Sequence, residues 1–227
     1  MLKGFVTVLC ISFSIISCAQ VHEVGLSVGG TNYIGDIGST NYFSADNVGT
    51  GLVYKYNLNP RIALRGSYRY VLVSAEDVNA STSFRTNRGL KFSNTIHELA
   101  LGIEFNFYDY DHSSPEKDAT PYILLELSGF GYQTLAETAT IDRLDDTQNT
   151  YSYTIPFGVG YKMKLLNKFA VAFETKFSYT FKDDLDFQKA TIPELNFGGN
   201  GNDWYVFSGI SIVYTFGRPA CYSSKFN

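Results

Sequence analysis

The sequence predicts an all-β protein, an eight-stranded antiparallel up-and-down transmembrane β-barrel whose lumen is filled by charged side chains. Three observations predict it. Apolar residues alternate with small or polar residues over eight segments, the connections between these segments alternate in length, and aromatic residues make up 16% of the 227 residues. Strict period two places the two residue classes on opposite faces of a sheet. A full apolar face with charges on the other face is typical of a barrel that faces lipid.

The first half of the chain contains four such segments, at residues 22–30, 49–57, 61–74 and 94–108. The last is the clearest, because Leu99, Leu101, Ile103, Phe105 and Phe107 share one face. In all four segments the opposite face carries the lysine, arginine and glutamate residues. The pattern therefore predicts four strands, each with one apolar and one polar side.

The second half of the chain predicts four more strands. Residues 151–165 and 169–181 form a hairpin in which apolar and polar residues alternate without a break, and residues 204–216 repeat the pattern. In that last segment Trp204, Val206, Ile210, Ile212, Tyr214 and Phe216 are predicted to face outward, and Ser211 and Thr215 inward. The segment 121–135 is the weakest, since four apolar residues run together at 122–125 and leave its faces open. We place Glu126 inward.

The polar faces together predict a network of charges in the lumen. Its members are Glu23, Lys55, Arg65, Arg69, Glu98, Glu104, Glu126, Lys162, Lys164, Glu174 and Lys176. Eight strands leave an interior just wide enough for side chains. The two signs are nearly balanced, so pairing can offset the desolvation that isolated buried charges would suffer. We therefore expect a plugged lumen rather than a pore.

The connections provide an independent check on the topology. Short turns follow the second and sixth strands, the connection 109–120 is of medium length, and long loops follow the first, third, fifth and seventh strands. With both termini periplasmic, every long loop is extracellular, as in bacterial outer-membrane barrels. The alternative is a soluble lipocalin-like barrel with its faces reversed, which the aromatic rims, the loop lengths and the N-terminal segment disfavour.

The N-terminus predicts export. A short positive start, an apolar core at 5–16 and the small residues 17–19 form a signal peptide at 1–19, followed by the barrel at 20–216 and a periplasmic tail at 217–227. The sequence Ile15–Cys18 also resembles a lipoprotein box, which would instead place a lipid on Cys18. No later segment has the roughly 18 consecutive apolar residues of a membrane helix. Outer-membrane lipid is thus the expected surrounding of the barrel.

Charge and composition exclude several function classes. A net charge of −4 excludes a basic nucleic-acid footprint. No HxxxH, CxxC or GxSxG spacing is present, so we predict no catalytic residues, no cofactor and no metal. The histidines are His22, His97 and His112. Cys221 is interpreted as a passive tail thiol.

Two chemical alternatives remain open. His97 beside Asp183 or Asp184 could serve a barrel enzyme. The cluster of Asp183, Asp184 and Asp186 could bind calcium, although a solvated loop is the favoured interpretation.

Several stretches resemble the PorG family, the small outer-membrane barrel of the Bacteroidota type IX secretion machinery. The resemblance spans nearly the whole mature chain, is most specific in the last stretch, and rests on Asn32–Gly38, Tyr54–Arg65, Ile96–Ala100, Ile103–Phe107, Ile155–Gly160 and Asp203–Tyr205 through Thr215–Tyr222. It implies a non-enzymatic component of the secretion and gliding apparatus that associates with a periplasmic ring built from PorK and PorN. It supplies no binding or catalytic residues.

If a periplasmic ring is the partner, contact has to come from the end of the barrel that carries the termini. The candidate segments are the turn after the second strand, the connection 109–120 and the tail. The candidate contact residues are Asn57, Asn59, Pro60, Gly217, Arg218, Pro219, Ala220, Cys221 and Tyr222. Two other function classes remain open: a structural or adhesin-like barrel that acts through its extracellular loops, and a barrel enzyme.

Overall fold

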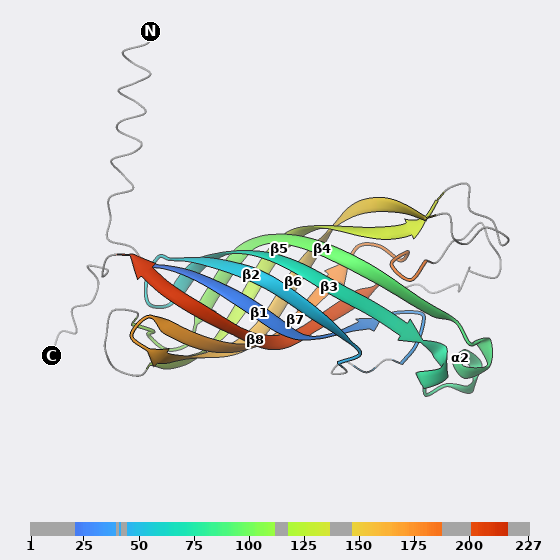
Figure 1. Ribbon diagram of the computed structural model, residues 1–227, viewed down its shortest axis with the longest axis horizontal. Coiled ribbons are helices and arrows are strands. Elements are labelled where there is room, and N and C mark those ends of the chain that lie inside the picture. The colour runs from blue at the N-terminus through green and yellow to red at the C-terminus, as the bar shows by residue number, and fades with distance from the viewer. Residues whose placement is uncertain are drawn as a thin grey trace, which may run out of the picture.

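A computed structural model describes residues 21–39, 41, 45–111, 118–136, 147–187 and 201–217. Eight antiparallel strands pair in sequence order and close into one barrel through β1 and β8 (Figure 1). They are β1 (Val21–Ile34), β2 (Asn47–Asn57), β3 (Ile62–Glu76), β4 (Lys91–Asn106), β5 (Ala119–Leu135), β6 (Thr147–Leu166), β7 (Phe169–Thr180) and β8 (Trp204–Gly217). The predicted fold class is confirmed.

The two faces of the wall lie as the alternation predicts. Leu101 of β4 is 71% exposed on the outside, and Phe157 of β6 and Phe173 of β7 are exposed as well, whereas Glu104 and Lys162 are buried inside. Because β-strand side chains alternate, an exposed apolar residue on one side forces its neighbour into the lumen. The soluble alternative with reversed faces is therefore wrong.

The structure assigns the faces that the sequence left open and shows that one residue predicted to face outward is buried. In β5, Tyr122, Leu124 and Glu126 point inward, while Leu125 is exposed. Val206 shares the phase of exposed Ile210 but is completely buried. Val206 therefore occupies an outward position of β8 without being exposed to solvent.

Pro156 lies in the middle of β6, where a missing N–H would normally weaken a sheet. Pairing between β5 and β6 runs to Leu125–Phe157, lapses, and resumes in the same register at Ser128–Thr154. On its other side Pro156 still pairs with Ser178 of β7. The proline is thus accommodated by a local gap in one ladder, without a change of register.

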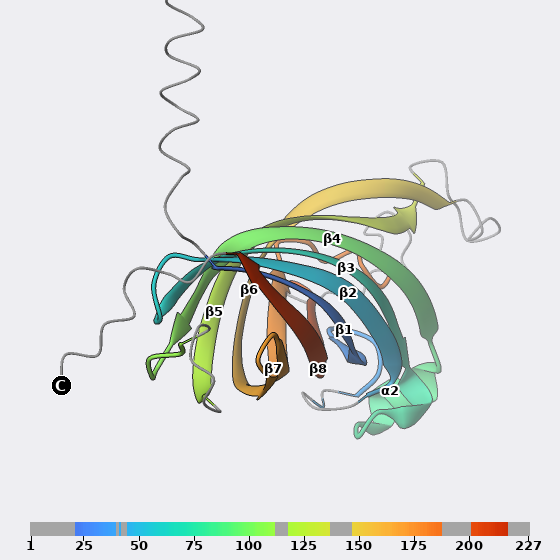
Figure 2. The same ribbon diagram turned by 60° about the vertical axis from the view of Figure 1, so that its left-hand side comes forward.

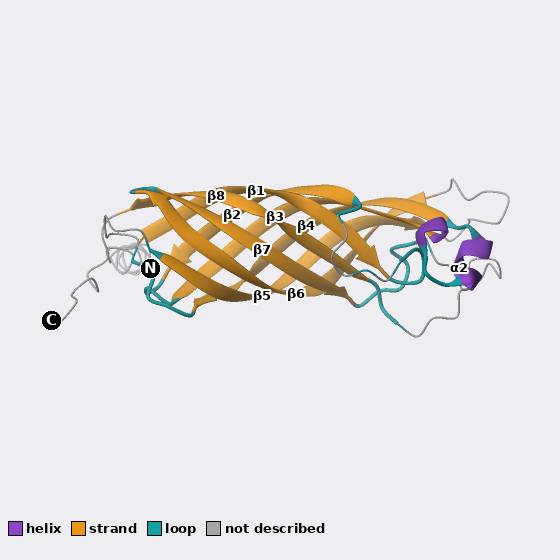
Figure 3. Cartoon of the chain, turned by 90° about the horizontal axis from the view of Figure 1, so that it is seen from below, coloured by secondary structure: helices purple, strands orange, loops and turns teal. Residues whose placement is uncertain are grey.

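The two ends of the barrel differ in length and content. The turns after β2 and β6 lie at the end of the chain termini, and the described parts of the longer connections lie at the other (Figures 1 and 2). There the β3–β4 connection forms a short 3₁₀ segment, η2 (Asp77–Asn79), and a helix, α2 (Ser83–Arg88) (Figure 3). None of the described helices has the length and apolar character needed to cross a membrane.

Toward the loop end the barrel interior is apolar, which the prediction of an entirely charged lumen missed. The apolar cluster consists of Tyr33, Ile37, Val71, Val73, Phe92, Ile96, Phe130, Tyr132, Leu185 and Tyr205. The strands are longer at this end than the sequence predicts, and β6 begins at Thr147 rather than at Tyr151. Tyr33 and Phe92 lie in the added lengths of β1 and β4, and with the other residues of the cluster they form an apolar layer above the charged layer.

Candidate functional site

The predicted charges meet in the lumen. All eleven side chains are buried, and they come from every strand except β8. They are Glu23, Lys55, Arg65, Arg69, Glu98, Glu104, Glu126, Lys162, Lys164, Glu174 and Lys176, with five carboxylates and six cations. Buried charges persist only when each is paired and hydrogen-bonded, so their partners decide what the lumen can do.

Glu104 is the centre of the first group of ion pairs. Its Oε2 lies 2.6 Å from the Lys55 ammonium and 3.3 Å from the Arg65 guanidinium, and its Oε1 accepts a hydrogen bond of 2.7 Å from Lys162. Both lysines also lie over the ring of Tyr122, at 5.2 and 5.8 Å from its centroid. One carboxylate therefore compensates three cations.

Glu174 is the centre of the second group. Arg65 donates two hydrogen bonds to its two oxygens, at 2.6 and 3.0 Å, in the bidentate geometry that makes arginine–carboxylate pairs strong. Arg69 donates at 2.5 Å and the Tyr122 hydroxyl at 2.9 Å. Arg65 and Glu174 stand on β3 and β7, four strands apart in a ring of eight, so this pair crosses the full diameter of the lumen.

Glu98 and Glu126 complete the network toward the loop end. Lys176 donates to Glu98 and, at 2.9 Å, to Glu126, which lies 3.2 Å from the Arg65 Nε. The Tyr205 hydroxyl of β8 donates to Glu98 of β4, which crosses a second diameter. Direct contacts between opposite walls therefore cross the lumen at these levels. The arrangement locks the strands together rather than forming a channel.

The remaining two charges lie nearer the terminal end. Glu23 accepts a hydrogen bond of 2.9 Å from the Asn57 amide, which also donates to the Val21 carbonyl at 3.2 Å. Lys164 donates to the Asp111 carbonyl at 3.5 Å. Asn57 is buried, which argues against its predicted role as a partner contact. Its amide NH₂ group instead donates both of these hydrogen bonds within the terminal end of the barrel.

The turn after β2 is ordered by side-chain and carbonyl hydrogen bonds. The Asn59 Oδ1 accepts from the N–H groups of Arg61 and Ile62, each at 2.8 Å. The Pro60 carbonyl accepts from Asn106 Nδ2 at 2.9 Å and from the Tyr110 N–H at 3.2 Å. Asn59 and Pro60 are half-buried, and their turn is a firm part of the rim. Gly217 ends β8 with a φ of 115°, which favours glycine, and residues 218–222 lie outside the described part of the chain.

Aspartates that the sequence did not single out hold the loop end together. Asp77 is completely buried and accepts hydrogen bonds from the N–H groups of Gly38 (2.9 Å) and Leu90 (3.1 Å) and from the Arg88 Nε (2.7 Å). Arg88 also donates to the Asp36 carbonyl at 2.7 Å. We call these five residues the outer clamp. Burial alone would raise the pKa of Asp77, but the hydrogen bonds and the charge of Arg88 outweigh it and lower the pKa.

The outer clamp joins the β1–β2 and β3–β4 connections and presents two exposed apolar side chains. Arg85 of α2 extends the junction with hydrogen bonds to the carbonyls of Gly38 (2.7 Å) and Gly35 (3.1 Å). On the outside of this junction Phe84 is 76% and Val78 68% exposed. The loop end thus offers a hydrogen-bonded surface with two largely exposed apolar side chains.

The acidic segment after β7 enters the barrel mouth, so the prediction of a solvated loop is wrong. Leu185 is completely buried in the apolar cluster and donates its N–H to Asp203 at 3.0 Å. The Tyr33 hydroxyl donates to the other oxygen of Asp203, and Tyr132 donates to Asp184 at 2.5 Å. In the described part of the chain, no group of three or more His, Cys, Asp or Glu side chains is arranged to hold a metal ion.

We expect the protonation state of Asp203 to determine how stably the segment after β7 packs in the barrel mouth. Burial and the charges of Asp186 and Asp183 raise its pKa to about 8, against the opposing hydrogen bonds of Tyr33 and Leu185. Because the folded-state pKa exceeds the ordinary value of about 3.9, this contribution to stability is complete below about pH 4. It is lost as the pH rises through 8.

Asp203→Asn imitates the protonated acid and tests this expectation. Hydrogen exchange of the Leu185 amide should match wild type at pH 4 and be slower than wild type at pH 8. Comparison at equal pH cancels the intrinsic exchange rate. If the ratio of the wild-type exchange rate to the variant exchange rate were the same at both pH values, Asp203 would not titrate in this range.

The histidines lie apart from the acidic segment. His97 is exposed on the outer wall, and its Nδ1 is 2.9 Å from the Tyr68 hydroxyl. Asp184, in contrast, is held at the barrel mouth by Tyr132. His97 and Asp184 thus have other hydrogen-bond partners, and the considered pairing of His97 with Asp183 or Asp184 stays a prediction. His22 contacts the Tyr54 hydroxyl at 2.7 Å on the terminal side of the outer wall, and His112 lies outside the described residues.

The class of protein follows from the outer and inner faces of the barrel wall. A closed barrel with an exposed apolar outside and an ionised, internally paired inside has the architecture of an outer-membrane β-barrel. The chain belongs to the family described as domain of unknown function DUF6089, whose model matches residues 2–225. No curated protein matches the chain.

Solved structures share the fold at low sequence identity. Neisserial surface protein A is 12% identical with a TM-score of 0.50, covering 86% of this chain and 97% of its own. Ail, the attachment invasion locus protein of Yersinia pestis, in complex with the heparin analogue sucrose octasulfate, is 12% identical with a TM-score of 0.49, covering 87% and 99%. The N-terminal barrel of Pseudomonas aeruginosa OprF is 12% identical with a TM-score of 0.46, covering 86% and 97%.

Proposed function

We propose that the protein is a non-enzymatic outer-membrane barrel of the type IX secretion and gliding machinery that associates with its periplasmic ring of PorK and PorN type. The sequence stretches that resemble the PorG family support the specific role. The observation that carries the general role is the blocked lumen, crossed by Arg65–Glu174 and by Glu98–Tyr205. A barrel that transmits nothing through its centre acts through its rims or its outer wall.

The terminal end is the surface proposed to meet the ring. Its short turn after β2 is fixed by Asn59 and Pro60, and Leu58 at its tip is 43% exposed. The neighbouring exposed pair of Arg61 with Asp109, at 2.5 Å, adds a polar contact to this rim. A preordered turn loses little conformational entropy when it binds, which favours a stable contact.

In-cell photocrosslinking tests this role. A photoreactive residue at Leu58 should give adducts with the ring proteins, whereas the same residue at Phe84, on the opposite end, should give none. Adducts from Phe84 but not Leu58 would contradict a periplasmic contact. Replacement of residues 218–222 with unchanged secretion and unchanged ring recovery would exclude the tail as the contact.

A second candidate is an adhesin-like barrel that acts through its extracellular loops. The outer clamp favours it, since Asp77 and Arg88 hold the loop that exposes Phe84 and Val78. Phe84→Ser with Val78→Ser should abolish surface binding and leave secretion intact if this role holds. Loss of secretion with unchanged surface binding would exclude it.

A further inference from the structure

The outer wall contains a groove at the place where β4 and β5 separate. Their ladder ends at His97–Gly131, and beyond this pair β4 continues with β3 alone while β5 continues with β6 (Figure 1). Asn94 bridges the open seam, because its amide donates to the Gln133 carbonyl at 2.7 Å and its Oδ1 accepts from the Gln133 N–H at 3.1 Å. The seam is thus open but held at a fixed width.

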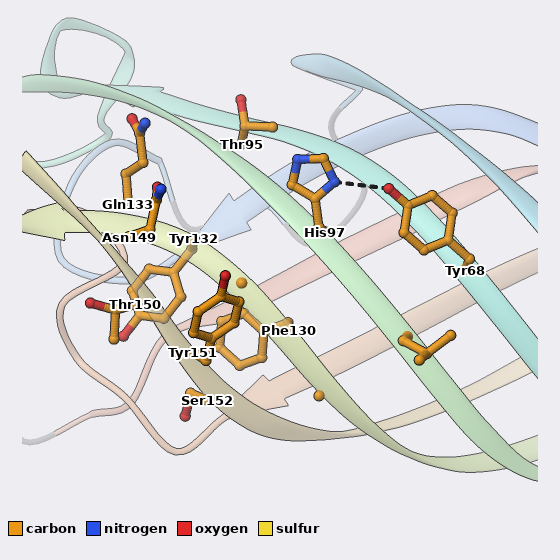
Figure 4. Close-up of a pocket in the computed structure, with 13 residues that line it drawn as sticks. Tyr68, Thr95, His97, Phe130, Tyr132, Gln133, Asn149, Thr150, Tyr151 and Ser152 are labelled. Carbon is orange, nitrogen blue, oxygen red and sulfur yellow. Dashed lines mark hydrogen bonds between the residues drawn. The ribbon is translucent and has the colours of Figure 1, made fainter.

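Two glycines make the floor of this groove. Gly129 and Gly131 occupy successive outward positions of β5, where other strands carry large apolar side chains. Tyr151 of β6, which is 81% exposed, and His97 with its partner Tyr68 form the two walls (Figure 4). The groove has a volume of about 700 Å³, within the range of about 300–1,000 Å³ of small-molecule sites.

The groove changes character along the strands. Leu99, Gly129 and Tyr151 line it toward the centre of the barrel, whereas Thr95, Gln133 and Asn149 line it toward the loops. Among the described residues that line the groove there is no lysine or arginine. A lipid with several phosphates would require such cations, whereas amide and hydroxyl groups suit ester carbonyls and a single net-neutral headgroup.

We propose that this groove binds one zwitterionic phospholipid, with an acyl chain along Gly129 and Gly131 and the headgroup beside Gln133 and Asn149. The groove is continuous with the apolar outer band around Leu99 and Leu101, so lipid already covers its lower edge. The inference rests on the membrane location and is independent of the secretion role. A bound lipid would fill the space that the two absent side chains leave and close the seam against water.

Native mass spectrometry of the full barrel released from detergent tests the proposal. The probes are phosphatidylethanolamine and, in parallel, lipid A. Wild-type protein should retain one phosphatidylethanolamine, and Gly129→Leu, which fills the floor, should retain at least fivefold less. A Cβ at Gly129 meets nothing closer than 3.9 Å, so the barrel should still fold.

Gly66→Leu is the matched control, because Gly66 is also an outward glycine of the wall, and a Cβ there would meet the end of the flexible Leu101 side chain at 3.3 Å, which can shift. It should retain lipid as wild type does. Tyr151→Ala, which removes one exposed wall, should weaken retention without filling the floor. Equal retention by all variants, preferential retention of lipid A, or a protein dimer in place of the lipid-bound monomer would overturn the proposal.

Discussion

Glu104→Gln should lower the free energy of unfolding of the barrel by about 3–5 kcal/mol, the cost of breaking a buried ion pair from one side. Lys55 and Lys162 are buried within 2.7 Å of this carboxylate. A neutral amide leaves their charges without compensation in a space that water does not reach. Urea titration in detergent micelles, followed by tryptophan fluorescence of Trp204, measures the change.

Asp109→Asn is the control for this result. Asp109 pairs with Arg61 at 2.5 Å, but both side chains are more than half exposed. An exposed pair contributes at most about 1 kcal/mol, so this variant should unfold close to wild type. Equal and small effects of both variants would mean that the Glu104 group is solvated, which contradicts an occluded lumen.

Leu101→Arg should lower the free energy of unfolding in liposomes by about 2–4 kcal/mol, as for a cation on the lipid face near the bilayer midplane. Leu101 is flanked across the strands by Gly66 and Leu127 in the centre of the apolar band. The guanidinium would have to leave water for hydrocarbon with no partner nearby. Urea titration of the protein reconstituted in liposomes measures the change.

Phe84→Arg serves as the matched control. Phe84 is equally apolar and more exposed, but it lies on α2 outside the barrel wall. Arginine there remains in water, so stability should be unchanged. A penalty at Phe84 as large as at Leu101 would contradict the distinction between a lipid-facing wall and water-facing loops.

Period-two alternation predicts the strands and their faces because a sheet imposes it on every residue. The alternation cannot assign inward and outward positions where consecutive residues are all apolar, as at Tyr122–Leu125. It also underestimates strand length. The β5–β6 ladder continues through Gln133 and Asn149, which backbone hydrogen bonds pair without any apolar pattern.

The same alternation predicts which charged residues face the lumen. It does not predict which of them form ion pairs with one another. Arg65 and Glu174 are 109 residues apart, and only closure of the barrel brings them together. Asp77 and Asp203 carry no sequence signal because they lie in loops, where polar residues are expected to be solvated. The position of Asn57 next to a short turn predicts exposure, whereas its inward phase buries it.

The most direct test of the inside-out barrel is a spin-label scan along β4 in liposomes. Single cysteines at positions 98–104, in a background free of native cysteine, report collision with oxygen, which concentrates in lipid, and with a water-soluble nickel complex. Oxygen accessibility should peak at Leu99, Leu101 and Ile103 and fall at Glu98, Ala100, Gly102 and Glu104, with little nickel accessibility at any of the seven. Maxima at Glu98 and Glu104, or nickel accessibility at Leu101, would contradict a wall that turns its apolar face to lipid.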